Sequence, residues 1–120
     1  MELIALASSG KGTWGQISGL INKQKWDKII LICPDFFKQN LQSFDFTQKA
    51  EIFSFNFDKP IAQLILEIRD KLKTKIDGTE VALSIASGDG REHMILISSI
   101  LQVPAGIKFV ALTKDGILEF

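Results

Sequence analysis

A stretch rich in glycine indicates how this chain folds: Ser87-Gly88-Asp89-Gly90-Arg91-Glu92-His93-Met94. It lies between an apolar run at residues 81–86 and a helical pattern at residues 94–101. A turn of small residues that joins a buried strand to the start of a helix is where open α/β sheets bind ligands. A second turn of this kind follows the first apolar run and comprises Ser8-Ser9-Gly10-Lys11-Gly12-Thr13-Trp14. Two such turns in 120 residues indicate a nucleotide- or phosphate-binding domain.

Around these turns, short apolar runs alternate with helical patterns. We expect strands at residues 3–7, 29–33, 51–57, 81–86, 107–112 and 117–120. Helices are expected at residues 13–23, 35–44 and 91–101, and a further one opens at Asp58-Lys59-Pro60 and ends at residues 77–79. Thr13 and Asp58 are placed to cap the helices that they begin, and Asp115-Gly116 predicts a two-residue hairpin turn.

This order predicts an α/β fold: three layers, Rossmann-like, with a mostly parallel sheet and a C-terminal β-hairpin. In a doubly wound sheet the first and fourth strands commonly flank the point where strand order reverses. We therefore expect the two glycine turns to share one crevice at the carboxyl edge of the sheet.

Length, charge and cysteine content exclude several classes of protein. The length fits a single domain over residues 1–120. Fourteen basic and fourteen acidic residues cancel, which argues against binding of long nucleic acid. Cys33 is the single cysteine, which fits a reducing cytoplasm and excludes a cysteine-based metal cluster. No apolar run approaches the ~20 residues of a membrane span, and the N-terminus does not resemble a signal peptide. We expect a cytoplasmic protein without metal, cofactor or membrane contact.

The first turn has the features of an anion site. Gly10 and Gly12 can take positive φ and let the backbone approach a ligand, while Lys11 adds charge beside a helix start. The same small residues also suit an ordinary strand-to-helix turn. The turn does not match a Walker A loop, but Gly10, Gly12 and Gly15 match Gly-x-Gly-x-x-Gly, with Asp35 as the nearest acidic partner for a ribose.

The second turn supplies Ser87, Gly88, Asp89, Gly90 and Arg91. Arg91 either grips a phosphate through its two-pronged guanidinium or pairs at the surface with Glu92 or Asp89. His93, the single histidine, is either a proton carrier or a polar surface residue. Trp14 either stacks on a base or anchors its helix on the sheet.

The order of elements and the two turns resemble the CRISPR-associated Rossmann-fold (CARF) family. The resemblance rests on Ser8-Ser9-Gly10-Lys11-Gly12-Thr13, on Ser87-Gly88-Asp89-Gly90-Arg91 and on the hairpin at residues 109–120. It implies a homodimer that binds a cyclic oligoadenylate, and some family members also cleave this ligand. Family members usually carry a second domain, a winged helix or a nuclease; we find neither pattern in this sequence and expect a stand-alone CARF-like domain. The first turn is more weakly similar to the Ser-Gly-Gly-x-Asp-Ser turn of ATP pyrophosphatases, with Gly12 in place of the acid.

These observations give a set of candidate residues. The expected ligand-binding residues are Ser8, Ser9, Gly10, Lys11, Gly12, Thr13, Trp14, Ser87, Gly88, Asp89, Gly90 and Arg91. If the ligand is cleaved, a ribose 2′-hydroxyl attacks the neighbouring phosphate without metal, Lys11 steadies the developing charge and His93 carries the proton. The alternative is a Rossmann-like interaction module that has no ligand and no catalytic activity.

Overall fold

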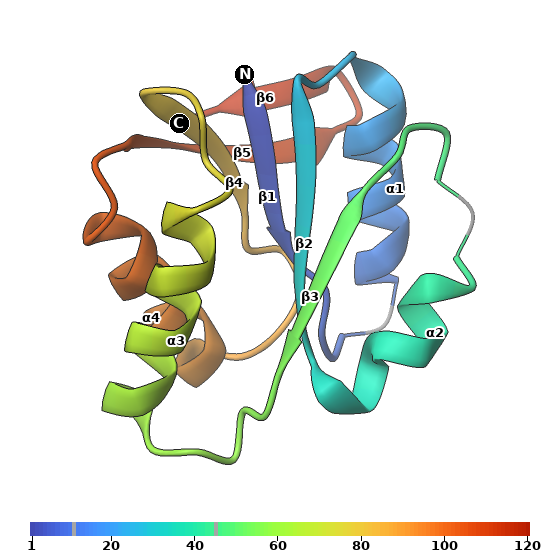
Figure 1. The fold of residues 1–120 in the computed structure, drawn as a ribbon. Helices are drawn as coiled ribbons and strands as arrows, with labels where there is room; N and C mark the ends of the chain where they lie inside the picture. Colours follow the sequence, from blue (N-terminus) through green and yellow to red (C-terminus); the bar gives the residue numbers. More distant parts are fainter. Residues whose placement is uncertain (11, 45) are drawn as a thin grey trace.

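The computed structural model describes residues 1–10, 12–44 and 46–120 and confirms the expected α/β fold (Figure 1). The elements in chain order are β1 (Glu2–Leu6), α1 (Thr13–Lys23), β2 (Lys28–Pro34), the 3-10 helix η1 (Asp35–Phe37), α2 (Lys38–Gln42), β3 (Glu51–Phe55), α3 (Ile61–Lys73), β4 (Glu80–Ser84), α4 (Gly90–Leu101), β5 (Gly106–Thr113) and β6 (Gly116–Glu119). No helix within the described ranges is long and apolar enough to cross a membrane.

The six strands form one sheet in the order β3-β2-β1-β4-β5-β6. All neighbours are parallel except β5 and β6, which form the C-terminal hairpin. Ile4 of β1 lies opposite Ile30 of β2 on one side and Leu83 of β4 on the other. Strands β1 and β4 are therefore adjacent, as predicted, and strand order reverses between them.

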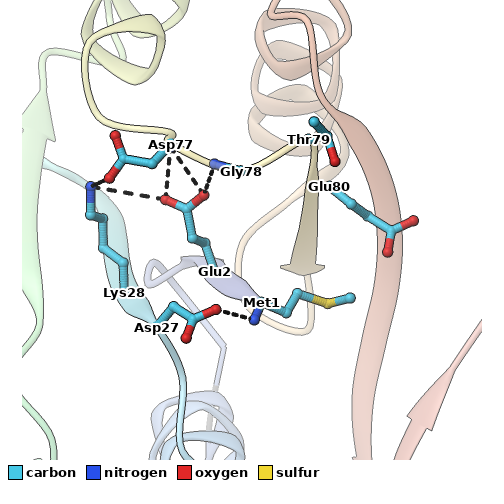
Figure 2. A pocket seen from close by; sticks show the side chains of 8 residues that line it. All are labelled: Met1, Glu2, Asp27, Lys28, Asp77, Gly78, Thr79 and Glu80. Carbon is cyan, nitrogen blue, oxygen red and sulfur yellow. Dashed lines mark hydrogen bonds and ion pairs between the residues drawn. The ribbon is translucent and has the colours of Figure 1, made fainter.

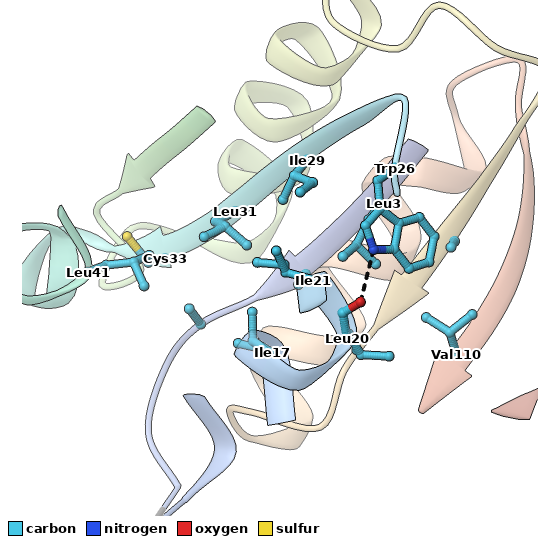
Figure 3. Close-up of a cluster of buried hydrophobic side chains, with 13 residues drawn as sticks. Leu3, Ile17, Leu20, Ile21, Trp26, Ile29, Leu31, Cys33, Leu41 and Val110 are labelled. Atoms are coloured by element: carbon cyan, nitrogen blue, oxygen red, sulfur yellow. Dashed lines mark hydrogen bonds between the residues drawn. The ribbon is translucent and has the colours of Figure 1, made fainter. Parts of the chain in front are cut away.

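Helices cover both faces of the sheet, which explains why the central strands are apolar throughout. In Figure 1, α1 and α2 lie on one side and α3 and α4 on the other. Alternate residues of β1 enter separate cores: Leu3 packs on the α1 side and Ile4 on the α3 and α4 side. Trp26 closes the first core, where its Nε1 donates to the Leu20 carbonyl at 3.0 Å (Figure 3).

Two of the expected helix caps are wrong. Gly12 is the N-cap of α1, and the Thr13 hydroxyl instead donates to the Gly10 carbonyl at 2.8 Å. Pro60 is the N-cap of α3, and Asp58 lies in a turn where its own backbone N–H donates to Asn56 Oδ1. Neither α1 nor α3 has a side-chain cap. Each helix instead begins directly after a residue with a special backbone, Gly12 for α1 and Pro60 for α3.

Several boundaries also differ from expectation. The helix expected at residues 35–44 is a 3-10 turn followed by the five residues of α2. Strand β3 ends at Phe55 rather than at 57, β4 ends at Ser84, and α3 ends at Lys73. The hairpin turn is shifted by one residue: Thr113 pairs with Gly116, so the turn residues are Lys114 and Asp115. Gly116 begins β6 with a φ of 115°.

Candidate functional site

The two glycine turns contact each other directly at the carboxyl edge of the sheet. The backbone N–H of Gly88 donates to the Ser9 carbonyl at 2.8 Å, and the N–H of Ser8 donates to Ser87 Oγ at 2.8 Å. We call residues 7–12 and 85–89 the turn pair; of its members, Lys11 lies outside the described residues. The two turns meet where strand order reverses, as predicted, and a crevice shared between them stays a prediction.

Ser87 is the centre of the turn pair. Its side chain is fully buried, and its Oγ lies 2.9 Å from Thr13 Oγ1 and 3.3 Å from the Ser9 carbonyl. Because the same oxygen also accepts the Ser8 N–H, one hydroxyl contacts both turns and the start of α1. Ser87 and Ser8 are buried and hold the two turns together, whereas Ser9, Gly10, Gly12 and Asp89 are exposed to solvent.

Three glycines in the turn pair have backbone angles that other residues rarely adopt. The φ angles are 129° at Gly10, 78° at Gly12 and 94° at Gly88. This confirms the positive φ predicted for the first two. At Gly88 a Cβ atom would lie 2.5 Å from Leu6 Cδ2, so packing also requires glycine there. A Cβ at Gly90 would meet open space.

The starts of α1 and α4 differ in how their backbone N–H groups are satisfied. Helix α1 begins on Gly12 without a side-chain cap and without an acidic residue in its first turn, and its Thr13 N–H donates to the Gly10 carbonyl at 3.2 Å. The first N–H groups of a helix carry partial positive charge and bind anions when nothing else does. The start of α1 therefore suits a phosphate or a carboxylate.

Helix α4 instead begins with a capping box made by two carboxylates. Asp89 accepts from the Glu92 N–H at 2.8 Å, and Glu92 accepts from the Asp89 N–H at 3.0 Å. Glu92 is only 6% exposed, and its other carboxylate oxygen accepts from Ser8 Oγ at 2.6 Å. The spacing Asp89-x-x-Glu92 is the sequence signal for a capping box, a role that was not predicted for these two residues. These negative charges disfavour a phosphate at α4.

Arg91 and His93 each bind backbone carbonyls. The Arg91 guanidinium donates to the carbonyls of Phe57 and Lys59, so it holds the loop between β3 and α3. Arg91 does not pair with Glu92 or Asp89, so the surface ion pair that was one of its two predicted roles is not formed. His93 Nε2 lies 2.7 Å from the Ser87 carbonyl and must carry the proton there, because a carbonyl only accepts. His93 thereby ties the first turn of α4 back to the second glycine turn.

Trp14 is packed within the protein. Its Nε1 donates to the Ser8 carbonyl at 2.9 Å, and its ring meets Phe37 and Phe44 edge to face. These contacts match the helix-anchoring alternative, and the indole also holds the start of the first turn. The Gly-x-Gly-x-x-Gly match has less structural support, because Gly15 faces open space rather than a closely packed strand.

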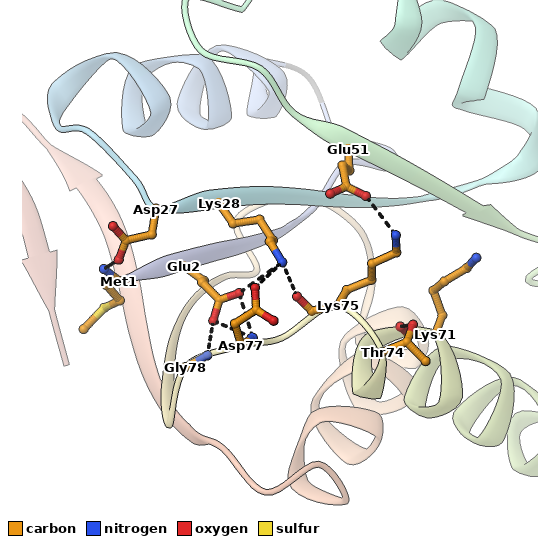
Figure 4. A network of polar contacts seen from close by, with 10 residues as sticks. All are labelled: Met1, Glu2, Asp27, Lys28, Glu51, Lys71, Thr74, Lys75, Asp77 and Gly78. Carbon is orange, nitrogen blue, oxygen red and sulfur yellow. Dashed lines mark hydrogen bonds and ion pairs between the residues drawn. The ribbon is translucent and has the colours of Figure 1, made fainter.

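A second polar cluster lies at the amino edge of the same strands (Figure 4). Buried Glu2 accepts from the N–H groups of Gly78 and Asp77 at 2.6 and 3.1 Å. Lys28 Nζ donates to the Lys75 carbonyl and to Asp77 Oδ2 at 2.5 and 2.8 Å. The hydrogen bond to Asp77 raises the pKa of Lys28. These bonds fasten the connection between α3 and β4.

Beside this cluster lies an open hollow of about 470 Å³ (Figure 2). Its lining residues are Met1, Glu2, Asp27, Lys28, Asp77, Gly78, Thr79 and Glu80. Glu2, which lines it, lies five residues along β1 from Ala7 of the turn pair, a separation of roughly 17 Å. In Figure 2 Glu2 bonds the backbone of Asp77 and Gly78, Lys28 bonds Asp77, and Met1 bonds Asp27, so we assign this hollow a structural role.

The residues predicted from sequence fall into three groups. Residues 9, 10, 12, 89 and 90 are exposed at the turn pair and Gly88 is half-buried there, while Ser8, Thr13, Trp14, Ser87 and His93 hold the two turns in place. Arg91 acts on the neighbouring loop. Within the described ranges, no group of three His, Cys, Asp or Glu side chains is arranged to hold a metal ion. In comparisons with protein-family models, curated proteins and solved structures, nothing matches this chain.

Proposed function

We propose that this protein binds a nucleotide at the turn pair, with a phosphate at the start of α1. The observation that carries the proposal is the start of α1 on Gly12, which has no side-chain cap. The first turn, which leads into this helix, is hydrogen-bonded to the second turn where strand order reverses. Exposed backbone N–H groups at such a point bind phosphate in open α/β sheets. Lys11 adds a positive charge from the same turn.

The second turn would contact a different part of the ligand. The Asp89 carboxylate is exposed and negative, so it suits a ribose hydroxyl rather than a phosphate. Gly90 leaves the backbone open to a sugar or base. Arg91 would contribute indirectly, because its bonds to the carbonyls of Phe57 and Lys59 position this loop beside the second turn.

The ligand class within this proposal comes from the resemblance to CARF domains. It favours a cyclic oligoadenylate, whose alternating phosphates and ribose hydroxyls fit one anion-binding turn and one hydroxyl-binding turn. It also makes a homodimer part of the proposal, in a cytoplasmic setting. The rival is a Rossmann-like interaction module that does not bind a nucleotide.

Binding is tested by thermal unfolding with cyclic tetra-adenylate, ATP, NAD and S-adenosylmethionine. A ligand at ~100 times its Kd adds about 2.7 kcal/mol to the stability of the folded state. In a domain of this size that raises Tm by about 10 °C. If none of these ligands shifts Tm, the nucleotide proposal is overturned in favour of the interaction module.

The position of the phosphate is tested by titration calorimetry on Lys11→Ala and on Lys114→Ala. Lys114 is an exposed lysine in the hairpin turn and serves as the matched control. Loss of a charged hydrogen bond of about 1.5–3 kcal/mol weakens binding by roughly 10- to 100-fold in Lys11→Ala. Equal affinities of the two variants would move the phosphate away from the first turn.

Cleavage of the ligand is the second part of the proposal. The 2′-oxygen forms a bond to phosphorus, the bond from phosphorus to the 5′-oxygen breaks, and a 2′,3′-cyclic phosphate and a 5′-hydroxyl result. Cyclic tetra-adenylate is incubated with the parent, Lys11→Ala and His93→Ala in EDTA. Linear product from the parent and a sharp fall in Lys11→Ala support the step. An unchanged rate in His93→Ala removes the histidine from it, and no product from the parent leaves a binding protein.

A further inference from the structure

One face of the C-terminal hairpin is exposed over its outer part. On one side, Leu112 and Ile117 pair across the strands and pack into the core under α1. Residues 109, 111, 118 and 120 alternate with these and face the opposite side. On that side Leu118 is 52% exposed and Phe120 is 70% exposed. The outer end of the sheet is therefore bare on the α4 side.

Two aromatic rings occupy this bare face. Phe109 and Phe120 exchange backbone hydrogen bonds at 2.9 and 3.2 Å, and their rings stack with centroids 6.0 Å apart. The inner ring, Phe109, packs against the core that α3 and α4 share. The outer ring, Phe120, extends this apolar surface beyond the edge of α4.

Helix α4 borders this bare face with an apolar stripe of its own. Met94 is 49% exposed and Leu101 is 69% exposed, and half-buried Ile97 lies between them on the same side of the helix. Residues 94–101 contain no charged side chain. Helix α4 contacts β5, and Ile97 and Phe109 pack against the same core cluster, which places the stripe beside the hairpin face.

We propose that this surface is the interface between two copies of the chain. We call it the apolar step and define it by Met94, Ile97, Leu101, Phe109, Leu118 and Phe120. A helical ridge beside an uncovered sheet face is self-complementary: around a two-fold axis, α4 of each copy covers the hairpin face of the other. The inference rests on the homodimer of the proposed function and names its surface.

The size of the apolar step fits a second copy. A large aromatic side chain offers about 150–250 Å², so Phe120 alone exposes on the order of 100 Å². With its exposed neighbours the step approaches ~500 Å² in each copy, or ~1,000 Å² for the pair, which is the lower bound of a specific interface. Its lack of charge is typical of contacts between identical subunits.

The other apolar region of the surface is less suited to this contact. Phe53 of β3 is half-buried, and Lys71 and Lys75 lie over its ring at 4.9 and 5.6 Å. Two copies joined there would bring these lysines close together. Phe36 is 85% exposed, but it lies in η1. This element leads into α2, on the opposite side of the sheet from α4, so Phe36 is not part of the apolar step.

The test is the mass of the full chain in solution, measured by light scattering at about 100 µM without nucleotide. The parent is expected at twice the 13.4 kDa mass of one chain. Leu101→Glu and Phe120→Glu each place a charge in the apolar step and are expected to raise the dimer dissociation constant at least ~100-fold. Phe36→Glu is the matched control, since it adds the same charge to a more exposed phenylalanine, and it should remain dimeric.

A second measurement covers the case in which a charged variant unfolds. In the double variant Leu101→Cys, Leu118→Cys, oxidation should link two chains and give a product of twice the mass on a non-reducing gel. Cys33 is buried and does not compete. A monomeric parent would overturn both the homodimer and the step. A dimer that survives both glutamate variants but fails to cross-link would overturn the step alone, and nucleotide binding is measured separately.

Discussion

The Ser8 hydroxyl donates to the buried Glu92 carboxylate at 2.6 Å, which joins the end of β1 to the start of α4 across 84 residues of sequence. Glu92 also closes the capping box of α4. One side chain thus fixes both the first turn and the helix that follows the second turn. The geometry of the turn pair depends on this carboxylate.

We expect Glu92→Ala to lower the free energy of unfolding by about 1–3 kcal/mol, because it removes a cap and leaves the Ser8 hydroxyl without its acceptor. Urea denaturation measures the change. Glu80→Ala, at an exposed glutamate on β4, is the control and should stay within about 0.5 kcal/mol of the parent. Equal stability of the two variants would show that Glu92 does not hold the turns together.

Gly88→Ala and Gly90→Ala form a matched pair within one turn. At Gly88 the φ of 94° and the 2.5 Å approach of Leu6 Cδ2 should together cost about 2–4 kcal/mol. At Gly90, which begins α4 in open space, alanine should change stability by less than about 1 kcal/mol. Thermal unfolding of both variants checks the difference, and similar Tm values would contradict it.

Arg91→Ala should loosen the loop between β3 and α3, because its guanidinium donates to the carbonyls of Phe57 and Lys59. We expect hydrogen exchange over residues 56–60 to become at least ~5-fold faster, with a loss of about 1 kcal/mol in stability. Arg69→Ala, whose side chain bonds Asp70 and Gln102, should leave this segment unchanged. Unchanged exchange combined with lost nucleotide affinity would place Arg91 on the ligand instead.

Stability should fall at alkaline pH because burial raises the pKa of the Cys33 thiol to about 11. The folded state holds this proton more tightly than the unfolded state, in which the thiol has its ordinary pKa of 9.0. The contribution is complete below pH 9 and is lost as the pH rises toward 11. Between pH 8 and pH 10 we expect a loss of about 1 kcal/mol in urea denaturation. Cys33→Ala should lack this component, and identical pH profiles would contradict the assignment.

The sequence alone determined the architecture. The central strands are short runs of apolar residues because helices cover both faces, and that composition is visible without coordinates. The positive φ at Gly10 and Gly12 was also predictable, since a close strand-to-helix turn requires it. The adjacency of β1 and β4 followed from the connectivity rules of doubly wound sheets.

Only the tertiary structure decided what the polar side chains do. Thr13 and Ser87 have the right types for a ligand site, yet their hydroxyls meet each other across 74 residues of sequence, because long-range packing brings the two turns together. His93 bonds the Ser87 carbonyl six positions earlier in the chain. Arg91 meets the carbonyls of residues 57 and 59, which lie more than thirty positions away in the chain. Hydrogen bonds depend on distances of a few tenths of an ångström. Sequence spacing fixes such distances only within one helix or turn, so the Asp89 and Glu92 cap was predictable in principle and the contacts between the turns were not.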